Sequence, residues 1–481
     1  MNVKSISRTV GLILLITGIF QLFPLLIAVI DHEPRNILAY IESLCLILLV
    51  GSALLLFSRG GNRMFSAQEG FAATGLSWIF MSAFGALPFF LSGQIPSYVD
   101  AFFEMVSGFT TTGASILTDV EALSRCNLFW RSFSHWVGGM GILVFMLALL
   151  PAMGGATIHI LRAESPGPSV GKVVPKIRDS AKITYEIYLA LTVLLVILYL
   201  AGGMSLFDSL CIAFGTAGTG GFAVRTSSCA EYSPYIQTVT TIFMILFGVN
   251  FTVYFLLLQR KFRQALRSSE LWTYLGVILV ATLAISLNIF RSMSSFGQAV
   301  HHAAFTVSSL ITTTGYGTVD FNLWPEFSRV ILCFLMVMGA CAGSTGGGFK
   351  VSRIVILCRY ANNELKRLIH PRTVNVVQVD GKQISRETVH GVLVYTLFYI
   401  FIAMASMLLI SLDNFDASTT VSSVLATLNN IGPGLGAVGP AASFAGLSDL
   451  SKAVLCLDML AGRLEIFPLL VLLLPSTWAK K

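Results

Sequence analysis

Long runs of apolar residues, separated by short polar segments, recur along the whole chain. A helix needs about 20 consecutive apolar residues to cross a bilayer, and the runs come close to or exceed that length. They cover residues 10–30, 37–57, 71–92, 129–150, 183–203, 235–258, 271–290, 326–358, 388–411 and 450–474. We therefore predict an all-α polytopic membrane protein with about ten transmembrane helices, an even number that places both termini on one side.

The overall composition agrees with this pattern. Of the 481 residues, 55% are hydrophobic and only 11% are charged, whereas a soluble domain carries about twice that charged fraction. The first run is too long for the apolar part of a signal peptide and lacks a small-residue cleavage site, so it reads as a retained helix. No polar segment is long enough to fold as a separate soluble domain. The cysteines and histidines show no spacing typical of a metal site.

Lysine and arginine are distributed unevenly between the two sides of the predicted topology. They gather at both termini and in the segments 58–70, 151–182, 259–270 and 359–386. The segments on the other side carry Arg35, Arg125, Arg225 and Arg291. Because basic loops stay in the cytoplasm, both termini are predicted to be cytoplasmic. This topology also explains the net charge of +7, so the charge gives no indication of nucleic-acid binding.

The predicted outer segments are rich in carboxylates. Each of these residues alone is explained as part of a solvated loop, but together they could concentrate cations at an outer mouth. They are Asp100, Glu104, Asp119, Glu121, Asp208, Glu231, Asp320, Asp413 and Asp416.

The outer segments also contain an internal repeat. Four times, a span is followed by a short half-apolar stretch that fits a pore helix, a turn rich in glycine and threonine, and another span. Aligning the turns on Gly113, Gly220, Gly315 and Gly434 gives spacings of 107, 95 and 119 residues. The predicted organisation is two extra helices in 1–70, followed by repeats in 71–182, 183–270, 271–387 and 388–481.

Four irregular turns at membrane depth are costly unless they line a water-filled path. Potassium selectivity filters replace the hydration shell of the ion with backbone carbonyls from four loops. Glycine permits the left-handed backbone that such loops require, and threonine adds hydroxyl oxygens. The third turn, Thr313 to Gly317, is close to the TVGYG filter loop. The alternative is that the glycines only allow tight turns or helix packing. The predicted potassium-binding residues are Thr111, Thr112, Gly113, Thr219, Gly220, Thr313, Thr314, Gly315, Ile431, Gly432, Pro433 and Gly434.

The run 326–358 contains a glycine-rich string that a helix cannot accommodate cheaply, since each glycine costs about 1 kcal/mol relative to alanine. We predict that the span breaks here into an intramembrane loop that acts as a gate. A glycine-rich seam for helix packing is the alternative. The string consists of Gly343, Ser344, Thr345, Gly346, Gly347, Gly348, Phe349 and Lys350.

Two basic residues are added to the predicted gate. Arg463 lies within the last apolar run, where an unpaired charge is expensive. It is either an electrostatic barrier in the ion path or the partner of Asp458 or Glu465 in a structural ion pair. Lys350 is either a charge of the gate or the first lysine on the cytoplasmic side.

The turns, the glycine string and the arginine together resemble the membrane subunits of Trk-type bacterial potassium uptake systems, in the superfamily with Ktr and plant HKT transporters. The resemblance covers essentially the whole chain, including the two extra N-terminal helices. It implies a pseudo-fourfold pore in one chain, a gating loop below the filter, a matching arginine, and an inner-membrane location. Glycine in all four turns implies potassium, bound in the filter, rather than sodium.

The resemblance also implies partners. It predicts a homodimer in the lipid membrane and a cytosolic, nucleotide-binding regulatory subunit of the TrkA type. No cofactor is expected within this chain, and transport is either passive or coupled to protons or sodium. The other readings are a solute symporter with broken helices, which has inverted twofold repeats, and a membrane enzyme, for which the sequence offers no catalytic groups.

Overall fold

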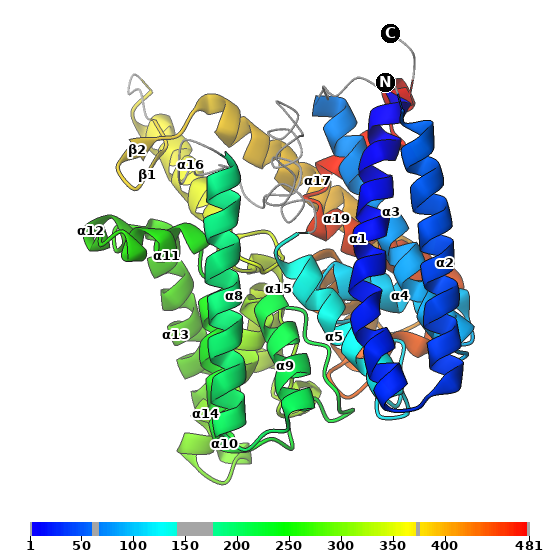
Figure 1. Cartoon of the computed structure of the whole chain (residues 1–481). Helices are drawn as coiled ribbons and strands as arrows, with labels where there is room; N and C mark the ends of the chain where they lie inside the picture. The colour runs from blue at the N-terminus through cyan, green and yellow to red at the C-terminus, as the bar shows by residue number, and fades with distance from the viewer. Residues whose placement is uncertain (1, 60–66, 142–176, 372–375, 479–481) are drawn as a thin grey trace.

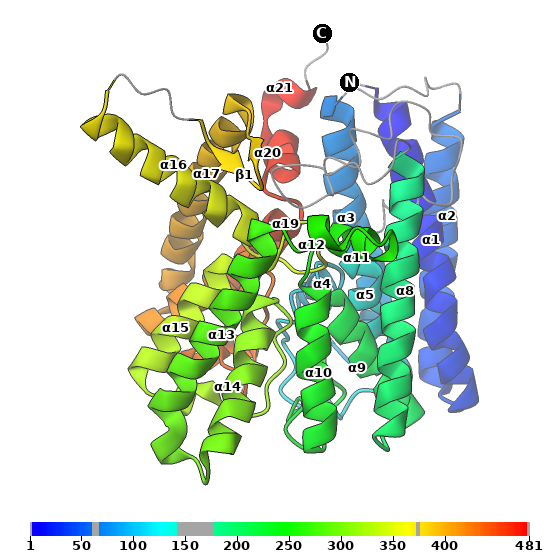
Figure 2. The same cartoon turned by 90° about the vertical axis from the view of Figure 1, so that its left-hand side faces the viewer.

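Helices form nearly all of the regular structure in the computed structural model, which describes residues 2–59, 67–141, 177–371 and 376–478. In that part of the chain, strands are limited to the antiparallel pair β1 (Gln378–Val379) and β2 (Lys382–Gln383). The predicted all-α class is confirmed. The start of α1 and the short helix α21 (Pro475–Trp478) lie at the same end of the molecule, together with the β1–β2 hairpin (Figures 1 and 2).

Two long helices precede the repeated part of the chain. They are α1 (Val3–Ile30) and α2 (Pro34–Phe57), which pack against each other along one edge of the molecule (Figure 1). Their close approach depends on small residues, because a Cβ on Gly11 would lie 3.0 Å from the carbonyl oxygen of Gly51. Both helices also contact α3 (Ala67–Leu91), which ties the pair to the first repeat.

Four units follow, and each has a long helix, a short helix, an irregular turn and a second, inner helix. The long helices are α3, α8 (Ile177–Ala201), α13 (Ser269–Ile289) and α17 (Arg386–Ile410). The short helices, here called pore helices, are α4 (Tyr98–Phe109), α9 (Leu206–Gly218), α14 (Phe296–Ile311) and α18 (Ala417–Leu428). The inner helices are α5 (Arg125–Gly139), α10 (Pro234–Phe247), α15 (Glu326–Met338) and α19 (Asp449–Arg463).

The pore helices begin in the same way in all four units. The side chain before each helix accepts a hydrogen bond from the backbone N–H of the third helical residue, which satisfies one of the unpaired donors at a helix start. The capping residues are Ser97, Ser205, Ser295 and Asp416. Each helix then runs toward the irregular turn that follows it, so the partial negative charge of its C-terminus is directed at that turn.

The units close into a ring. Each inner helix contacts the pore helix of the following unit: α5 packs on α9, α10 on α14, α15 on α18, and α19 on α4. Since the last contact returns to the first unit, the four units surround one central axis. All four units have the same orientation relative to the axis, whereas the symporter alternative has inverted repeats.

The inner helices are shorter than the apolar runs predicted. They have 15, 14, 13 and 15 residues, so each ends before crossing a bilayer. Among the described residues, six helices are long and apolar enough to span a membrane, and a seventh span results if α10 and α11 (Phe251–Leu258), bent by 89°, count as one. Besides the break predicted in 326–358, the chain also breaks after α10 and α19, which the apolar runs did not indicate.

The breaks occur at glycines or at residues with positive φ. In the second unit the chain bends at Gly248, where a Cβ would lie 2.4 Å from the hydroxyl of Tyr274. In the fourth unit Glu465 and Ile466 have positive φ before α20 (Phe467–Leu473) begins. In the third unit the chain leaves the helix at Gly339 and resumes at α16 (Val351–Ile369). The break therefore starts four residues earlier than the predicted start at Gly343. The segment between α11 and α13 includes the short helix α12 (Phe262–Ala265).

Candidate ion-conduction site

The turns after the four pore helices share one backbone geometry. In each turn an N–H bonds to the carbonyl five residues earlier, at 2.8–2.9 Å. The donors are Thr112, Gly220, Thr314 and Ile431, and the acceptors are Ser107, Gly215, Ser309 and Ala426. In each turn the residues on either side of that donor have positive φ. They are Thr111 and Gly113, Thr219 and Gly221, Thr313 and Gly315, and Asn430 and Gly432.

The second member of each pair packs against the next turn. A Cβ on Gly113 would lie 2.0 Å from the carbonyl oxygen of Gly220, and one on Gly221 would lie 1.9 Å from that of Thr314. A Cβ on Gly315 would lie 2.1 Å from the carbonyl oxygen of Ile431. The ring closes because a Cβ on Gly432 would lie 2.7 Å from the carbonyl oxygen of Thr112. The four turns therefore converge on one axis, each glycine against a backbone carbonyl of its neighbour.

This geometry corrects the alignment made from the sequence in two of the four repeats. The glycine with positive φ in the second turn is Gly221 rather than Gly220, and in the fourth turn it is Gly432 rather than Gly434. Gly434 instead packs on Ser422 and Val438. Gly221 and Asn430 were both missed. A signal was available at the start of the pore helices, because Gly113, Gly221 and Gly432 each lie 16 residues after the capping residues Ser97, Ser205 and Asp416.

Threonine and asparagine side chains form hydrogen bonds within the turns and between the fourth turn and the first. Within the first and third turns, the hydroxyls of Thr110 and Thr112, and of Thr312 and Thr314, are 2.8 Å apart. Asn430 donates from Nδ2 to the hydroxyl of Thr112 at 3.0 Å, joining the fourth turn to the first. The side chains that form these bonds are uncharged.

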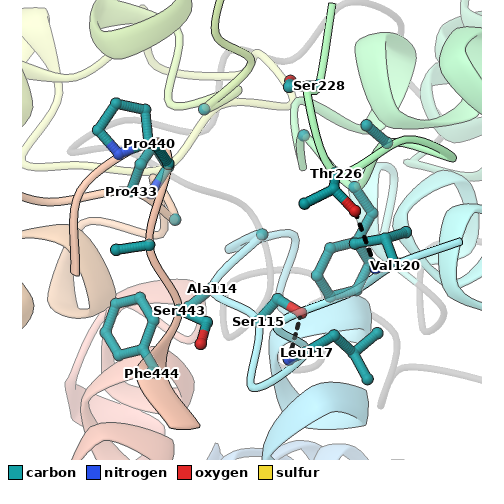
Figure 3. Close-up of a pocket in the computed structure, with 18 of the residues that line it drawn as sticks. Ala114, Ser115, Leu117, Val120, Thr226, Ser228, Pro433, Pro440, Ser443 and Phe444 are labelled. Atoms are coloured by element: carbon teal, nitrogen blue, oxygen red, sulfur yellow. Dashed lines mark hydrogen bonds between the residues drawn. The ribbon is translucent and has the colours of Figure 1, made fainter. Parts of the chain in front are cut away.

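Outside the turns lies a cavity of about 200 Å³. It is lined by side chains including Ser115, Thr226 and Phe444 (Figure 3) and by the four glycines that pack on the next turn, here called the ring glycines: Gly113, Gly221, Gly315 and Gly432. The outer loops around it are joined from unit to unit by hydrogen bonds. The pairs are Val120 N to Thr226 Oγ1, Gly317 N to Ser228 Oγ, Gly436 N to Asn322 Oδ1, and Phe444 N to Ser115 O. A closed belt of loops therefore holds the mouth of the cavity.

Four of the nine outer carboxylates lie within 4 Å of a basic side chain, which offsets their charge. Asp100 pairs with Lys452 at 2.6 Å. Arg225 pairs with Glu231 at 2.6 Å and lies 3.9 Å from Asp208. The hydroxyl of Ser227 and then Arg225 hold the pKa of Glu231 below its usual value. These contacts weaken the interpretation of the acidic residues as a cation-collecting group.

Glu104 differs from the other outer carboxylates in its burial. It lies on α4, is fully buried, and pairs with the buried Arg131 of α5 at 2.7 Å. Its carboxylate also accepts hydrogen bonds from the hydroxyl and backbone of the segment after the first turn, at Ser115 and Ile116. The buried ion pair and these additional hydrogen bonds hold the segment that follows the first turn against α4 and α5.

The predicted intramembrane loop runs directly beneath the turns, on the side of the termini. The N–H of Gly347 donates to the hydroxyl of Thr313 at 2.6 Å. A Cβ on Gly346 would lie 2.9 Å from the carbonyl oxygen of Thr312, and one on Gly347 would lie 2.5 Å from that of Asn429. The glycines of the loop are thus needed for close approach to the third and fourth turns.

Other contacts fix the loop at its sides. Gly343 accepts a hydrogen bond from the N–H of Phe251 at 3.0 Å, and the hydroxyl of Thr345 donates to the carbonyl of Phe247 at 3.2 Å. Ser344 donates back to Cys341 within the loop. The loop therefore fills the break of the second inner helix as well as its own. Gly348, with positive φ, packs on Gly339.

Both predicted basic residues lie at this loop. Lys350 is buried and donates to the carbonyl of Gly346, which places it inside the loop rather than at the cytoplasmic surface. Arg463, the last residue of α19, donates to the carbonyl of Thr345 at 2.9 Å and to the hydroxyl of Thr111 at 3.2 Å. It also bonds to the carbonyls of Gly138 and Gly139 at the end of α5.

The expected ion-pair partners of Arg463 have other contacts. Asp458 accepts a hydrogen bond from Ser406 at 2.7 Å. Glu465 forms an ion pair with Arg353 of α16. These carboxylates support the helices around the last span, while the guanidinium of Arg463 is directed to backbone and hydroxyl oxygens of the loop and the first turn.

A chain with this ring of turns can be compared with known proteins. The TrkH family model, described as a cation transport protein, matches residues 32–479. The chain belongs to the TrkH family. The TrkH fold covers the whole of it: the crystal structure of the potassium transporter TrkH from Vibrio parahaemolyticus matches with a TM-score of 0.89 and 34% sequence identity, over 100% of both chains.

Curated TrkH relatives agree with this assignment. The Trk system potassium uptake protein TrkH of Escherichia coli K12 is 36% identical over 99% of this chain and 100% of its own length. The Trk system potassium uptake protein TrkG of the same strain is 30% identical over 99% of both chains. The family resemblance predicted from the sequence is confirmed. The chain is accordingly a multi-pass membrane transport protein and not an enzyme.

Proposed function

We propose that this TrkH-family chain takes up potassium ions through a single pore on the axis of its four units, with the four turns as the selectivity filter. The observation that supports this best is the closed ring, in which each of Gly113, Gly221, Gly315 and Gly432 packs on a carbonyl of the next turn. Rings of backbone carbonyls are the means by which potassium filters replace the hydration shell of the ion.

Potassium rather than another cation is supported by two independent points. The relatives in Escherichia coli carry the name potassium uptake protein. In addition, all four ring positions are glycine, and the linking residues are uncharged threonine and asparagine. A site of neutral oxygens suits a monovalent ion, which must leave as easily as it enters.

We further propose that the loop from Gly339 to Lys350 is the gate. It approaches the third and fourth turns within backbone contact, and Arg463 adds a positive charge at the same level through its bond to Thr345. A loop and a charge below the filter would obstruct a cation that had passed it. Transport can be passive or coupled to protons or sodium under this proposal.

Partners and orientation are part of the same proposal. The excess of lysine and arginine in alternate segments supports cytoplasmic termini in a bacterial inner membrane. The basic segments 151–182, 259–270 and 359–386 offer a docking surface for a nucleotide-binding regulatory subunit of the TrkA type. Most of the first segment lies outside the described residues. A homodimer is proposed from family resemblance, and cross-linking in native membranes would test it.

Purified protein in liposomes tests the function directly. With a potassium gradient across the membrane, we expect a current or ion flux that reverses near the potassium equilibrium potential and is much smaller for sodium. A protein that is folded and carries no potassium under any gradient, or that carries sodium equally well, contradicts the proposal. Flux of an organic solute with a cation would favour the symporter alternative.

A further inference from the structure

The imidazole of His135, on α5, lies between the first and second turns and is completely buried. Its Nδ1 is 2.7 Å from the carbonyl oxygen of Gly108. Because a carbonyl can only accept, Nδ1 carries a proton and donates it. The same carbonyl also accepts the N–H of Thr111 at 3.2 Å. His135 is therefore bonded to the group that closes the first turn.

The same imidazole is pressed against the second turn. A Cβ on Gly220 would lie 2.3 Å from both Cγ and Nδ1 of His135, and a Cβ on Gly218 would lie 2.2 Å from the carbonyl oxygen of His135. Gly220 does not have the left-handed backbone that its neighbour Gly221 has at φ +78°. The glycine at position 220 is thus required by the ring of His135, whereas that at 221 is required by its own conformation.

A second contact extends this arrangement to the residue after the ring glycine. The rings of His135 and Phe222 have centroids 4.2 Å apart, and the guanidinium carbon of Arg131 lies 4.1 Å from the centroid of the same phenyl ring. Arg131 and His135 are four residues apart on one face of α5. The carbonyl of Phe222 in turn accepts a hydrogen bond from the hydroxyl of Tyr316, in the third turn, at 3.3 Å.

We propose that His135 is a positioning residue for ion selectivity, a spacer that sets the distance between the first and second turns. The inference rests on the proposed function of the turns as a filter. The hydrogen bond fixes the side of the imidazole that faces the first turn, and the ring thickness sets the position of Gly220. Removing the imidazole lets the two turns approach or shift, so the carbonyl cage no longer matches one ion size.

The chemistry of the ring suggests a conservative replacement. Nε2 of His135 has no hydrogen-bond partner among the described residues, so only the Nδ1 donor and the bulk near Cγ are needed. Asparagine retains Cγ and places an amide donor near the position of Nδ1. We expect His135→Ala to reduce the potassium-to-sodium permeability ratio about tenfold, equivalent to about 1.4 kcal/mol, and His135→Asn to retain most of it.

The coupling between His135 and Gly220 gives the decisive experiment. Gly220→Ala should reduce both the permeability ratio and the thermal stability of the full-length protein in detergent, because its methyl group meets the imidazole. The double variant Gly220→Ala/His135→Ala should recover stability relative to Gly220→Ala alone. Gly221→Ala/His135→Ala is the matched control and should show no recovery, since its methyl group meets the carbonyl of Thr314.

The outcomes separate this inference from the proposed function. Absence of any potassium flux in the wild type contradicts the filter proposal and with it the claim about selectivity, while the stability coupling still tests the spacer contact. Wild-type selectivity in a folded His135→Ala variant overturns the positioning role. Additive stability losses in the Gly220→Ala/His135→Ala pair overturn the steric relation. If His135→Ala does not fold, the potassium-to-sodium permeability ratio of His135→Asn is the deciding measurement. A reduction of that ratio as large as the reduction in Gly220→Ala contradicts the proposal.

Discussion

The guanidinium of Arg463 donates a hydrogen bond of 2.9 Å to the main-chain carbonyl of Thr345. This bond joins the end of α19 to the loop that follows α15. The same side chain reaches the hydroxyl of Thr111 and the last carbonyls of α5. One residue of the fourth unit therefore connects the proposed gate, the first turn and the end of the first inner helix.

Replacing Arg463 with alanine should increase potassium conduction. The substitution removes a positive charge beside the proposed ion path and the donors that hold the loop at Thr345. We expect an increase of about tenfold, equivalent to about 1.4 kcal/mol of barrier, with little change in the potassium-to-sodium ratio. Flux into liposomes under a fixed potassium gradient measures the effect.

Arg463→Lys is the matched control for that experiment. It keeps the charge, but one ammonium cannot reproduce the planar fork that reaches Thr345 and α5 together, so an intermediate flux is expected. Thermal stability and detergent-extracted yield must be measured beside flux. A folded alanine variant with wild-type flux would show that the residue neither forms a barrier nor restrains the loop.

Deleting residues 346–348 should raise the flux that occurs without any regulatory partner. The deletion removes the N–H that donates to Thr313 and the carbonyl that accepts from Lys350, and it shortens the obstruction beneath the turns. Potassium uptake by cells that lack other uptake systems checks this. Loss of all flux, with the protein folded, would mean that the loop is needed to support the turns rather than to close the pore.

The register of the fourth turn can be tested with two neighbouring glycines. Gly432→Ala should reduce selectivity severely, because its φ is +99° and its Cβ would approach the carbonyl of Thr112. A loss of at least about tenfold in the potassium-to-sodium permeability ratio is expected, equivalent to about 1.4 kcal/mol. Gly434→Ala should affect stability through its contact with Ser422 while leaving the ratio near that of wild type. The reverse order of effects would support the alignment on Gly434.

The lengths of the apolar runs were sufficient to predict the helical membrane class, and the recurring glycine-rich turns were sufficient to predict four repeated units. Apolar runs reveal which segments enter a bilayer, because that property depends on composition alone. They do not reveal where an inner helix stops, since residues after the break remain apolar. The glycine at the bend, Gly248, packs against Tyr274, a residue of the next unit, and no local pattern records such a contact.

The candidate site was predicted in outline but not in register. A glycine can be required by its own backbone, as Gly221 is, or by a neighbour, as Gly220 is by His135. The two cases look alike in a sequence. His135 was missed because it is distant in sequence from the turns that it contacts, and Glu104 was grouped with the outer carboxylates although it is buried against Arg131. Arg463 was found because a charge in an apolar run is conspicuous, although its contacts were not those expected.

Glu104→Ala should destabilise the protein strongly. It leaves Arg131 buried without the carboxylate that lies 2.7 Å from its Nε, and breaking a buried pair costs about 3–5 kcal/mol. The double variant Glu104→Ala/Arg131→Met removes the stranded charge and should recover part of the loss. Thermal unfolding of the detergent-solubilised protein measures both. A single variant as stable as wild type would show that the pair contributes nothing to the fold.

Acid should weaken the cap of the fourth pore helix. The carboxylate of Asp416 accepts a hydrogen bond from the N–H of Thr419 at 3.2 Å and another from the hydroxyl of that residue. The hydroxyl bond, followed by the backbone N–H groups, lowers the pKa of Asp416 from its ordinary 3.8. A carboxyl with a lower pKa in the folded state stabilises the protein above its unfolded pKa, and this contribution is lost as the pH falls through the folded value.

Asp416→Ala should therefore cost about 1 kcal/mol at pH 7, and the difference from wild type should shrink below about pH 4. Asp416→Asn is the matched control, because asparagine caps a helix about as well and does not titrate. Thermal unfolding in detergent at pH 7 and pH 3 provides the comparison. An equal loss for Asp416→Ala at both pH values would mean that the cap of α18 does not depend on the charge of the carboxylate.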